Sequence, residues 1–343
     1  MDHGHGIVCD GENTRTTIPV KDRNVDDLVK DMGKMGFQGG QLGVSLKIWE
    51  RMLDEDVTIF LGLAGAMVPA GLGEFIAYLI RERMVDCLVS TGANLFHDLC
   101  EGLGIVHYKG SACADDCYLN ECKIDRIYDV FVSEIELHKA DLHISEFVKK
   151  LDPKKRYSSR ELMQMVGKGL PDTTILGAAH KAGVPIFVPA LGDSSWGIGM
   201  VIAYREGKKV MVDQIKDVDE ITKIVERSSK TGVIYIGGGV PKNFIQQTEV
   251  IAELIGDYSG GHSYAIQYTT DAPHWGGLSG CTFEEAISWG KVAKEASKVQ
   301  VFSDATITVP VVVQALKAAK HKRNSCPAFD WSGADLKLQY ERR

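Results

Sequence analysis

Short apolar runs rich in β-branched residues alternate with stretches of helical periodicity along most of the chain. Such alternation is typical of a parallel sheet with helices packed on its faces. We therefore expect an α/β protein with a single domain over residues 41–325. Strands are expected at 57–62, 86–90, 185–189, 209–212, 233–236, 264–268 and 299–302, and helices at 41–53, 74–83, 172–182, 218–228 and 243–255.

The segments outside this alternation are expected to be peripheral. Residues 1–40 carry little strand pattern, so we interpret them as an N-terminal extension that is partly mobile. Glycines at 36, 39 and 40 indicate a hinge before the first long helix. Residues 141–169 are charged and helical, which favours an excursion from the sheet, and residues 326–343 are interpreted as a C-terminal tail.

Composition and charge indicate which kind of partner, nucleic acid, membrane or small molecule, the chain is suited to bind. The chain has 343 residues, of which 44% are hydrophobic and 25% charged, as in ordinary globular proteins. A net charge of -7 without a basic block argues against nucleic acid and suits a cationic small substrate. The longest uncharged run, 57–73, is interrupted by glycines and Pro69, so no membrane span is expected. The first residues do not resemble a signal peptide, and a cytoplasmic location is expected.

The eight cysteines are scattered and fit reduced thiols better than a disulfide framework. Cys113, Cys117 and Cys122 are the nearest approach to a metal motif, but they lack the close pairs of structural zinc sites. We interpret them as part of a polar loop and expect no metal.

Small and polar residues follow several of the predicted strands. Ser90 to Gly92, Asp193, Gly237 to Gly239 and Asp304 all occupy such positions. At the carboxyl edge of a parallel sheet, their backbone amides could hold a pyrophosphate while the aspartates accept ribose hydroxyls. The dinucleotide fingerprint Gly-x-Gly-x-x-Gly is absent, however, so tight turns and helix N-caps remain alternative interpretations.

The run 279–291 holds the strongest candidate chemistry. We expect Lys291 near the start of a helix beside Trp289, where its amine loses part of its hydration and can attack a carbonyl or imine carbon. The alternative is a solvated lysine on an amphipathic helix. Glu285 lies four residues before Trp289, so the two could bind an ammonium group together. Glu285 could equally close a capping box with Thr282.

Together these motifs resemble deoxyhypusine synthase in their order and spacing. The elements that carry the resemblance are Ser90-Thr91-Gly92, Phe187-Val188-Pro189-Ala190-Leu191-x-Asp193, Gly237-Gly238-Gly239-Val240, Glu285-Ala286-x-Ser288-Trp289-Gly290-Lys291 and Asp304-Ala305. The resemblance covers about residues 36–316. It implies a Rossmann-like fold, a homotetramer with active sites at dimer interfaces, and bound NAD that takes hydride from a polyamine such as spermidine.

The resemblance also implies a covalent mechanism. The family's lysine, matched here by Lys291, captures an aminobutyl group as a Schiff base and passes it to an acceptor amine. That acceptor is a lysine of the hypusine-bearing translation factor or, in relatives that make homospermidine, a free diamine. The matching assigns cofactor binding to Ser90, Thr91, Gly92, Asp193, Thr270, Gly276, Asp304 and Ala305, and substrate binding to Glu285, Trp289 and Asn243.

Several family positions are altered in this sequence. Asn243 replaces a histidine and cannot accept a proton near neutral pH. Charged or polar positions around the expected ligands are occupied by Ala66, Pro69, Phe96, Ile198, Trp275 and Leu278. Compensating groups could come from His97, His262, Asp271 or His274.

This pattern is similar to the deoxyhypusine synthase-like branch of bacteria and archaea. The favoured hypothesis is an NAD-dependent aminoalkyl transferase. A catalytically silent regulatory or binding subunit is the main alternative, and a class I aldolase-type Schiff-base enzyme is a third.

Overall fold

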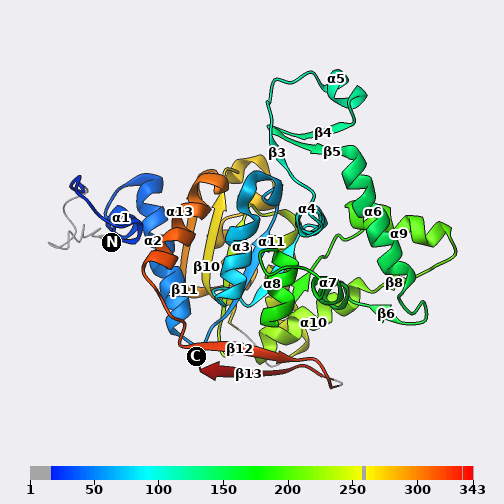
Figure 1. Cartoon of the computed structure of the whole chain (residues 1–343). Coiled ribbons are helices and arrows are strands. Elements are labelled where there is room, and N and C mark those ends of the chain that lie inside the picture. Colours follow the sequence, from blue (N-terminus) through cyan, green and yellow to red (C-terminus); the bar gives the residue numbers. More distant parts are fainter. Residues whose placement is uncertain (1–16, 257–259, 334, 343) are drawn as a thin grey trace.

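The computed structural model describes residues 17–256, 260–333 and 335–342. Its centre is a six-stranded parallel sheet with the order β11-β10-β9-β1-β2-β7 (Figure 1). The strands are β1 (Thr58–Leu63), β2 (Cys87–Ser90), β7 (Ile186–Phe187), β9 (Thr231–Ile236), β10 (His262–Thr269) and β11 (Val292–Phe302). The chain runs outward from β1 to β7 and then returns beside β1 at β9. This order is that of dinucleotide-binding folds, with the switch point between β1 and β9.

Helices cover both faces of the sheet, which confirms the predicted α/β class. Alternate residues of β1 point to opposite sides, so Ile59 and Leu61 join one buried cluster and Phe60 joins the other. The first cluster lies beneath α2 (Phe37–Asp54), α3 (Gly73–Arg81), α8 (Ile175–Ala182) and α13 (Ala305–Ala318). The second lies beneath α10 (Gln214–Arg227), α11 (Gly239–Ile255) and α12 (Phe283–Ser288).

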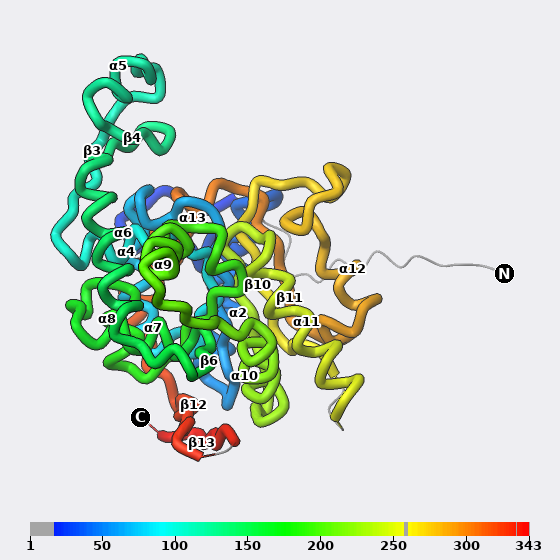
Figure 2. Tube along the Cα trace, turned by 90° about the vertical axis from the view of Figure 1, so that its right-hand side faces the viewer, coloured from blue at the N-terminus to red at the C-terminus, as the bar shows by residue number. Residues whose placement is uncertain are grey.

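An antiparallel excursion projects from the body and is called the arm, residues 108–133 (Figure 2). It comprises β3 (Tyr108–Lys109), α5 (Asp116–Glu121), β4 (Ile124–Ile127) and β5 (Val130–Ser133), with β5 in the middle of its sheet. The arm carries Cys113, Cys117 and Cys122, all exposed free thiols. Among the described residues, no group of three His, Cys, Asp or Glu side chains could hold a metal ion.

The arm follows α4 (Gly92–Gly102) and leads into a helical layer beside the sheet. This layer contains α6 (Glu134–Lys149), α7 (Ser159–Gly167) and α9 (Ser195–Arg205), and α6 packs closely on α9. Across residues 17–256, 260–333 and 335–342, no helix is long and apolar enough to cross a membrane.

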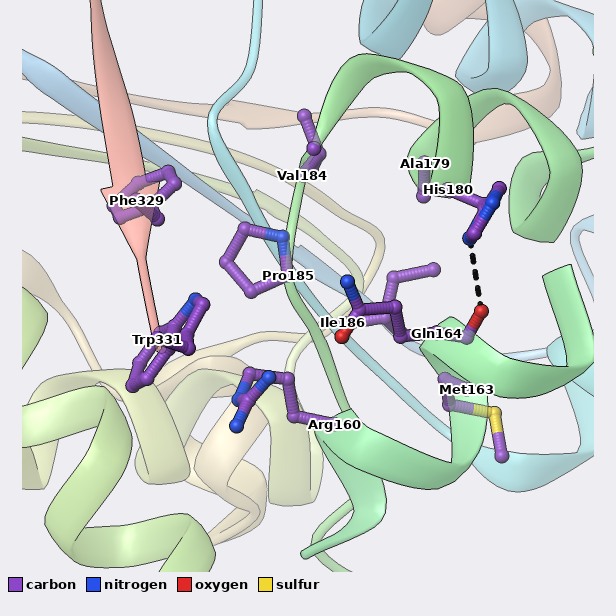
Figure 3. Close-up of a pocket in the computed structure, with 11 residues that line it drawn as sticks. Arg160, Met163, Gln164, Ala179, His180, Val184, Pro185, Ile186, Phe329 and Trp331 are labelled. Carbon is purple, nitrogen blue, oxygen red and sulfur yellow. Dashed lines mark hydrogen bonds between the residues drawn. The ribbon is translucent and has the colours of Figure 1, made fainter. Parts of the chain in front are cut away.

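The residues expected to form a C-terminal tail instead make a hairpin of β12 (Ser325–Asp330) and β13 (Lys337–Arg342). After β12, Trp331 stacks on the guanidinium of Arg160, with 4.0 Å between the Arg160 Cζ atom and the ring centroid (Figure 3). A cavity of about 60 Å³ lies beside this stack and reaches Pro185 and Ile186. Because β7 begins at Ile186, this cavity lies at the amino edge of the sheet, away from the strand ends where ligands gather.

Two local predictions are wrong, and a third holds only in part. The glycines near residue 40 are not a hinge, because α2 already begins at Phe37. A Cβ atom on Gly43 would lie 2.2 Å from the backbone nitrogen of Gly33, so the glycine allows α2 to pack closely against the segment that ends α1 (Val25–Met32). The strand predicted at 209–212 is β8 (Met211–Val212), which pairs with β6 (Arg156–Tyr157) outside the main sheet. Lys291 follows a helix rather than beginning one.

The predicted N-terminal extension is described only from residue 17, and residues 1–16 lie outside the described range.

Candidate functional site

The backbone of Lys291 is fixed between α12 and the sheet. Gly290 adopts a left-handed conformation with φ of 69°, which turns the chain out of α12. The backbone nitrogen of Lys291 donates to the carbonyl of Ala286 at 3.1 Å, and that of His262 donates to the carbonyl of Lys291 at 3.1 Å. The pairing of β10 with β11 then shifts register between His262 and Tyr264. Lys291 is therefore anchored just before an irregularity in the ladder.

The amine of Lys291 lies against two of the residues expected around it. Its Nζ atom donates to Oδ1 of Asn243 at 3.3 Å and lies 5.3 Å from the ring centroid of Trp289. The side-chain amide of Asn243 is oriented by donation to Gln247 Oε1 at 3.3 Å. The Trp289 side chain is 64% exposed, so part of its ring remains accessible to a second cation.

A second lysine, Lys242, lies beneath this site and was not singled out from the sequence. It is only 1% exposed, and its Nζ atom donates to Gln267 Oε1 at 2.9 Å and to the carbonyl of Cys281 at 2.6 Å. Both acceptors are neutral. Burial lowers the pKa of Lys242 to about 8, and the nearby charge of Lys291 acts in the same direction. The site thus contains a buried amine that exchanges a proton close to physiological pH.

Glu285 begins the last turn before Lys291. Its backbone nitrogen donates to Thr282 Oγ1 at 3.1 Å, so Thr282 is the N-cap of α12, which is one half of the predicted capping box. Its carboxylate interacts with the Cys281 thiol, whose pKa is raised mainly by burial and in part by Glu285. The capping arrangement therefore still leaves the carboxylate of Glu285 close enough to Lys242 to favour the charged form of that lysine.

The loops that follow β1, β2 and β7 meet at the carboxyl edge of the sheet. A Cβ atom on Gly92 would lie 2.3 Å from Ser194 Oγ, so only glycine fits between these two loops. Asn94 is fully buried, and its side-chain amide donates to the carbonyl of Gly65 at 2.9 Å and to Thr91 Oγ1 at 3.0 Å. Asn94, another residue not predicted, thereby holds the first two strand-end loops together.

A cavity of about 540 Å³ opens beside these loops, within the size range of small-molecule sites. Its wall includes Ala66, Pro69 and Asp304 from the body and Tyr108 and Tyr128 from the arm. Asp304 is also the N-cap of α13, because its carboxylate accepts from the backbone nitrogen of the second helical residue at 2.8 Å. The two interpretations of Asp304, cap and ligand group, are therefore geometrically compatible.

The deoxyhypusine synthase family model matches residues 27–316. The chain belongs to the deoxyhypusine synthase family. It is 55% identical over 337 residues to "Probable deoxyhypusine synthase 2" of Methanosarcina acetivorans, covering 96% of this chain and 97% of that protein. It is 51% identical to the protein of the same name from Archaeoglobus fulgidus, covering 87% of this chain and 99% of that protein.

A bacterial member of the deoxyhypusine synthase family is also similar. The "Deoxyhypusine synthase-like protein" of Chlorobaculum parvum is 40% identical, with 90% of this chain and 89% of that protein covered. A crystal structure of a "putative deoxyhypusine synthase" from Entamoeba histolytica superposes with a TM-score of 0.62 at 21% identity, covering 89% of this chain and 98% of that one. This last likeness supports the deoxyhypusine synthase fold.

The other residues matched to the deoxyhypusine synthase family are spread along the same edge. Ser90 is buried at the end of β2, whereas Asp193, Thr270 and Gly276 are exposed in the following loops, and Ala305 is the first residue of α13. The N-cap of α9 is Ser194 rather than Asp193. The cofactor roles of these residues stay predictions.

Two of the proposed compensating histidines are engaged elsewhere. His262 is fully buried, and its Nδ1 atom lies 2.9 Å from Glu249 Oε1. The Nδ1 atom of His97 lies 2.9 Å from His107 Nε2, and burial lowers the pKa of His97 to about 4. His274 packs against exposed Trp275 in the loop after β10, with 4.4 Å between ring centroids and an interplanar angle of 49°. Lys242, whose pKa burial lowers to about 8, can exchange a proton in the range that the missing histidine would have covered.

Proposed function

We propose that this protein is an NAD-dependent transferase that moves an aminoalkyl group, most simply aminobutyl, from a polyamine such as spermidine to an acceptor amine. The observation that carries the proposal is the contact of the Lys291 amine with Trp289 and Asn243. The hydrogen-bond acceptor of this amine, Asn243 Oδ1, is neutral, so it adds no negative charge that would hold the amine in its protonated form.

The residues at the strand ends fit NAD. The strand order has its switch point between β1 and β9, and the turn after β9 contains Gly239, where no heavy atom lies within 4 Å of the position of a Cβ atom and a ligand could approach the backbone closely. The residues that would hold the cofactor are Ser90, Thr91, Gly92, Asp193, Thr270, Gly276, Asp304 and Ala305. When bound, NAD would supply a reversible hydride acceptor, which makes the carbon beside the donor's nitrogen electrophilic.

The chain's own residues would then carry the group. Glu285 and Trp289 bind the ammonium end of the donor through charge pairing and cation–π attraction. Lys291 attacks the oxidised carbon, a new C–N bond forms to its Nζ atom, and the bond to the leaving amine breaks as that amine takes a proton. Asn243 holds Nζ in position, and Lys242 is the nearby group able to exchange the proton. Attack by the acceptor amine on the same carbon forms the new C–N bond and frees Lys291, and the hydride held by the cofactor would return to that carbon to give the amine product.

The acceptor is proposed to be a free or altered small amine rather than a lysine of the hypusine-bearing translation factor. Ile198 and Leu278 replace acidic groups expected to bind the usual polyamine, and both side chains are half exposed. Such changes weaken selection for a long cation. We further propose, from family membership, a cytoplasmic homotetramer with active sites at dimer interfaces.

The decisive experiment is trapping of the covalent intermediate. The protein is incubated with NAD and a panel of diamines and polyamines, reduced with borohydride, digested and examined by mass spectrometry. An aminoalkyl mass increment is expected on the peptide that contains Lys291. Lys291→Arg should abolish it, whereas Lys294→Arg, at an exposed position on β11, should not.

Absence of the adduct with every amine, in protein that binds NAD, would favour the catalytically silent alternative. If the adduct does form, labelled spermidine supplied with putrescine or with the translation factor would identify the acceptor by the product that carries the label.

A further inference from the structure

The cavity beside the strand-end loops has two unlike walls. The body contributes apolar Ala66 and Pro69 together with the carboxylate of Asp304. The arm contributes the tyrosines that line it, Tyr108 and Tyr128. The lining of this cavity of about 540 Å³ thus brings together two tyrosines and the carboxylate of Asp304, with the ion-paired Lys109 and Asp129 of the arm also in its wall.

Tyr128 is held in a conformation that its side chain disfavours. It is the first residue of the two-residue turn between β4 and β5, and its φ angle is +54°. Glycine and asparagine are the usual residues at such positions, because a bulky side chain meets its own backbone there. The Tyr128 side chain remains 75% exposed, so burial within this chain does not offset the strain. Strained residues at the rim of a cavity often have a binding role.

The turn is also rigidly supported. The carbonyl of Tyr128 accepts from Arg126 Nη1 at 2.9 Å, and Arg126 forms a two-pronged ion pair with Asp116 at 2.6 and 2.7 Å. The next residue, Asp129, forms an ion pair with Lys109 on β3. A side chain presented by such a fixed turn loses little entropy when a ligand binds.

We propose that Tyr128 is a cofactor-binding residue whose ring stacks on the adenine of a dinucleotide, while Asp304 binds the adjoining ribose. This inference rests on the proposed function and extends its cofactor site to the arm. Every base presents a π-face, so stacking supplies affinity where Ala66 and Pro69 offer no hydrogen bonds.

Calorimetric titration with the two halves of NAD tests this role. ADP-ribose and nicotinamide mononucleotide are titrated separately into the wild type, Tyr128→Gly and Tyr118→Ala. Glycine suits a positive φ, so Tyr128→Gly should melt no lower than the wild type. Tyr118 is the matched control, because it is 63% exposed on α5 of the same arm but does not line the cavity.

Tyr128→Gly should weaken ADP-ribose binding by about 10-fold, which is within the range of one base stack, and leave nicotinamide mononucleotide unaffected. Tyr118→Ala should change neither. Equal affinity of Tyr128→Gly and wild type for ADP-ribose overturns the assignment of Tyr128 but leaves the proposed function standing. A shift in oligomeric state with unchanged affinity overturns it too, in favour of a subunit contact. Failure of the wild type to bind NAD or either half removes both proposals.

Discussion

Replacing Lys242 with methionine isolates the energetic cost of a buried amine beside the candidate nucleophile. The two groups that accept from Lys242 would not be left unpaired, because Gln300 Nε2 also donates to Gln267 Oε1 at 2.8 Å and to the carbonyl of Cys281 at 3.3 Å. Methionine has a similar length and no charge. The substitution therefore removes the titration of Lys242 with little other change in hydrogen bonding.

The magnitude follows from the pKa of Lys242. Burial lowers it from 10.5 to about 8, so the native state releases this proton before the unfolded chain does. Between pH 8 and 10.5 the unfolded state binds more protons, and stability must rise with pH. A separation of about 2.5 pH units corresponds to about 3.5 kcal/mol, since each pKa unit is about 1.4 kcal/mol. This gain is absent below pH 8 and complete above pH 10.5.

Urea unfolding at several pH values from 7.5 to 10.5 measures this effect at fixed protein concentration. The stability of wild type relative to Lys242→Met should increase by most of this amount, about 3 kcal/mol, across the window, since other titrating groups cancel in the difference. Lys294→Met, at an exposed position, should follow the wild type at every pH. Parallel pH curves for wild type and Lys242→Met would refute the reasoning that burial governs the protonation of Lys242.

Two further substitutions test the strand-end loops. Gly92→Ala places a Cβ atom against Ser194 and should lower the free energy of unfolding in urea by about 1–3 kcal/mol. Gly192→Ala, with no heavy atom within 4 Å of the new Cβ atom, should lower it by less than about 0.5 kcal/mol. Equal losses of stability in the two variants would contradict the steric argument. Asn94→Ala removes the acceptor of the backbone nitrogen of Met67, which donates to Asn94 Oδ1 at 3.0 Å. The variant should lose about 2–4 kcal/mol of unfolding free energy and bind NAD more weakly. An unchanged NAD affinity would show that the loop geometry does not depend on Asn94.

The sequence predicts the sheet well because each of its central strands is a short run of mostly apolar residues. Residues 58–63 and 231–236 are continuous apolar runs, and both are fully buried strands in the structure. The contact between Trp289 and Lys291 could also be predicted, because the two residues are close in sequence. Asn243 was expected there only from the family resemblance, and the hydrogen bond to Lys291 brings it in from 48 residues away.

Burial of a charged group is what the sequence could not indicate. Lys242 follows a glycine-rich turn like many exposed lysines, and its acceptors lie 25 and 39 residues away along the chain. The prediction of a hinge at glycines 36, 39 and 40 failed because a glycine pattern does not reveal tertiary contacts. Glycine marks both a flexible joint and a close contact, and only the structure shows that Gly40 packs against the backbone carbonyl of Met35.

The anchoring of Lys291 has a consequence for how this site tolerates change during evolution. Its backbone bonds, to Ala286 and His262, both precede the register shift in β11, where pairing passes from Val292 directly to Ser297. Residues 293–296 therefore lie outside the regular ladder, and insertions or deletions among them can be absorbed without displacing the lysine. Relatives that differ in length at this point can keep the nucleophile in place while the shape of the neighbouring surface, and with it the choice of amine, is free to diverge.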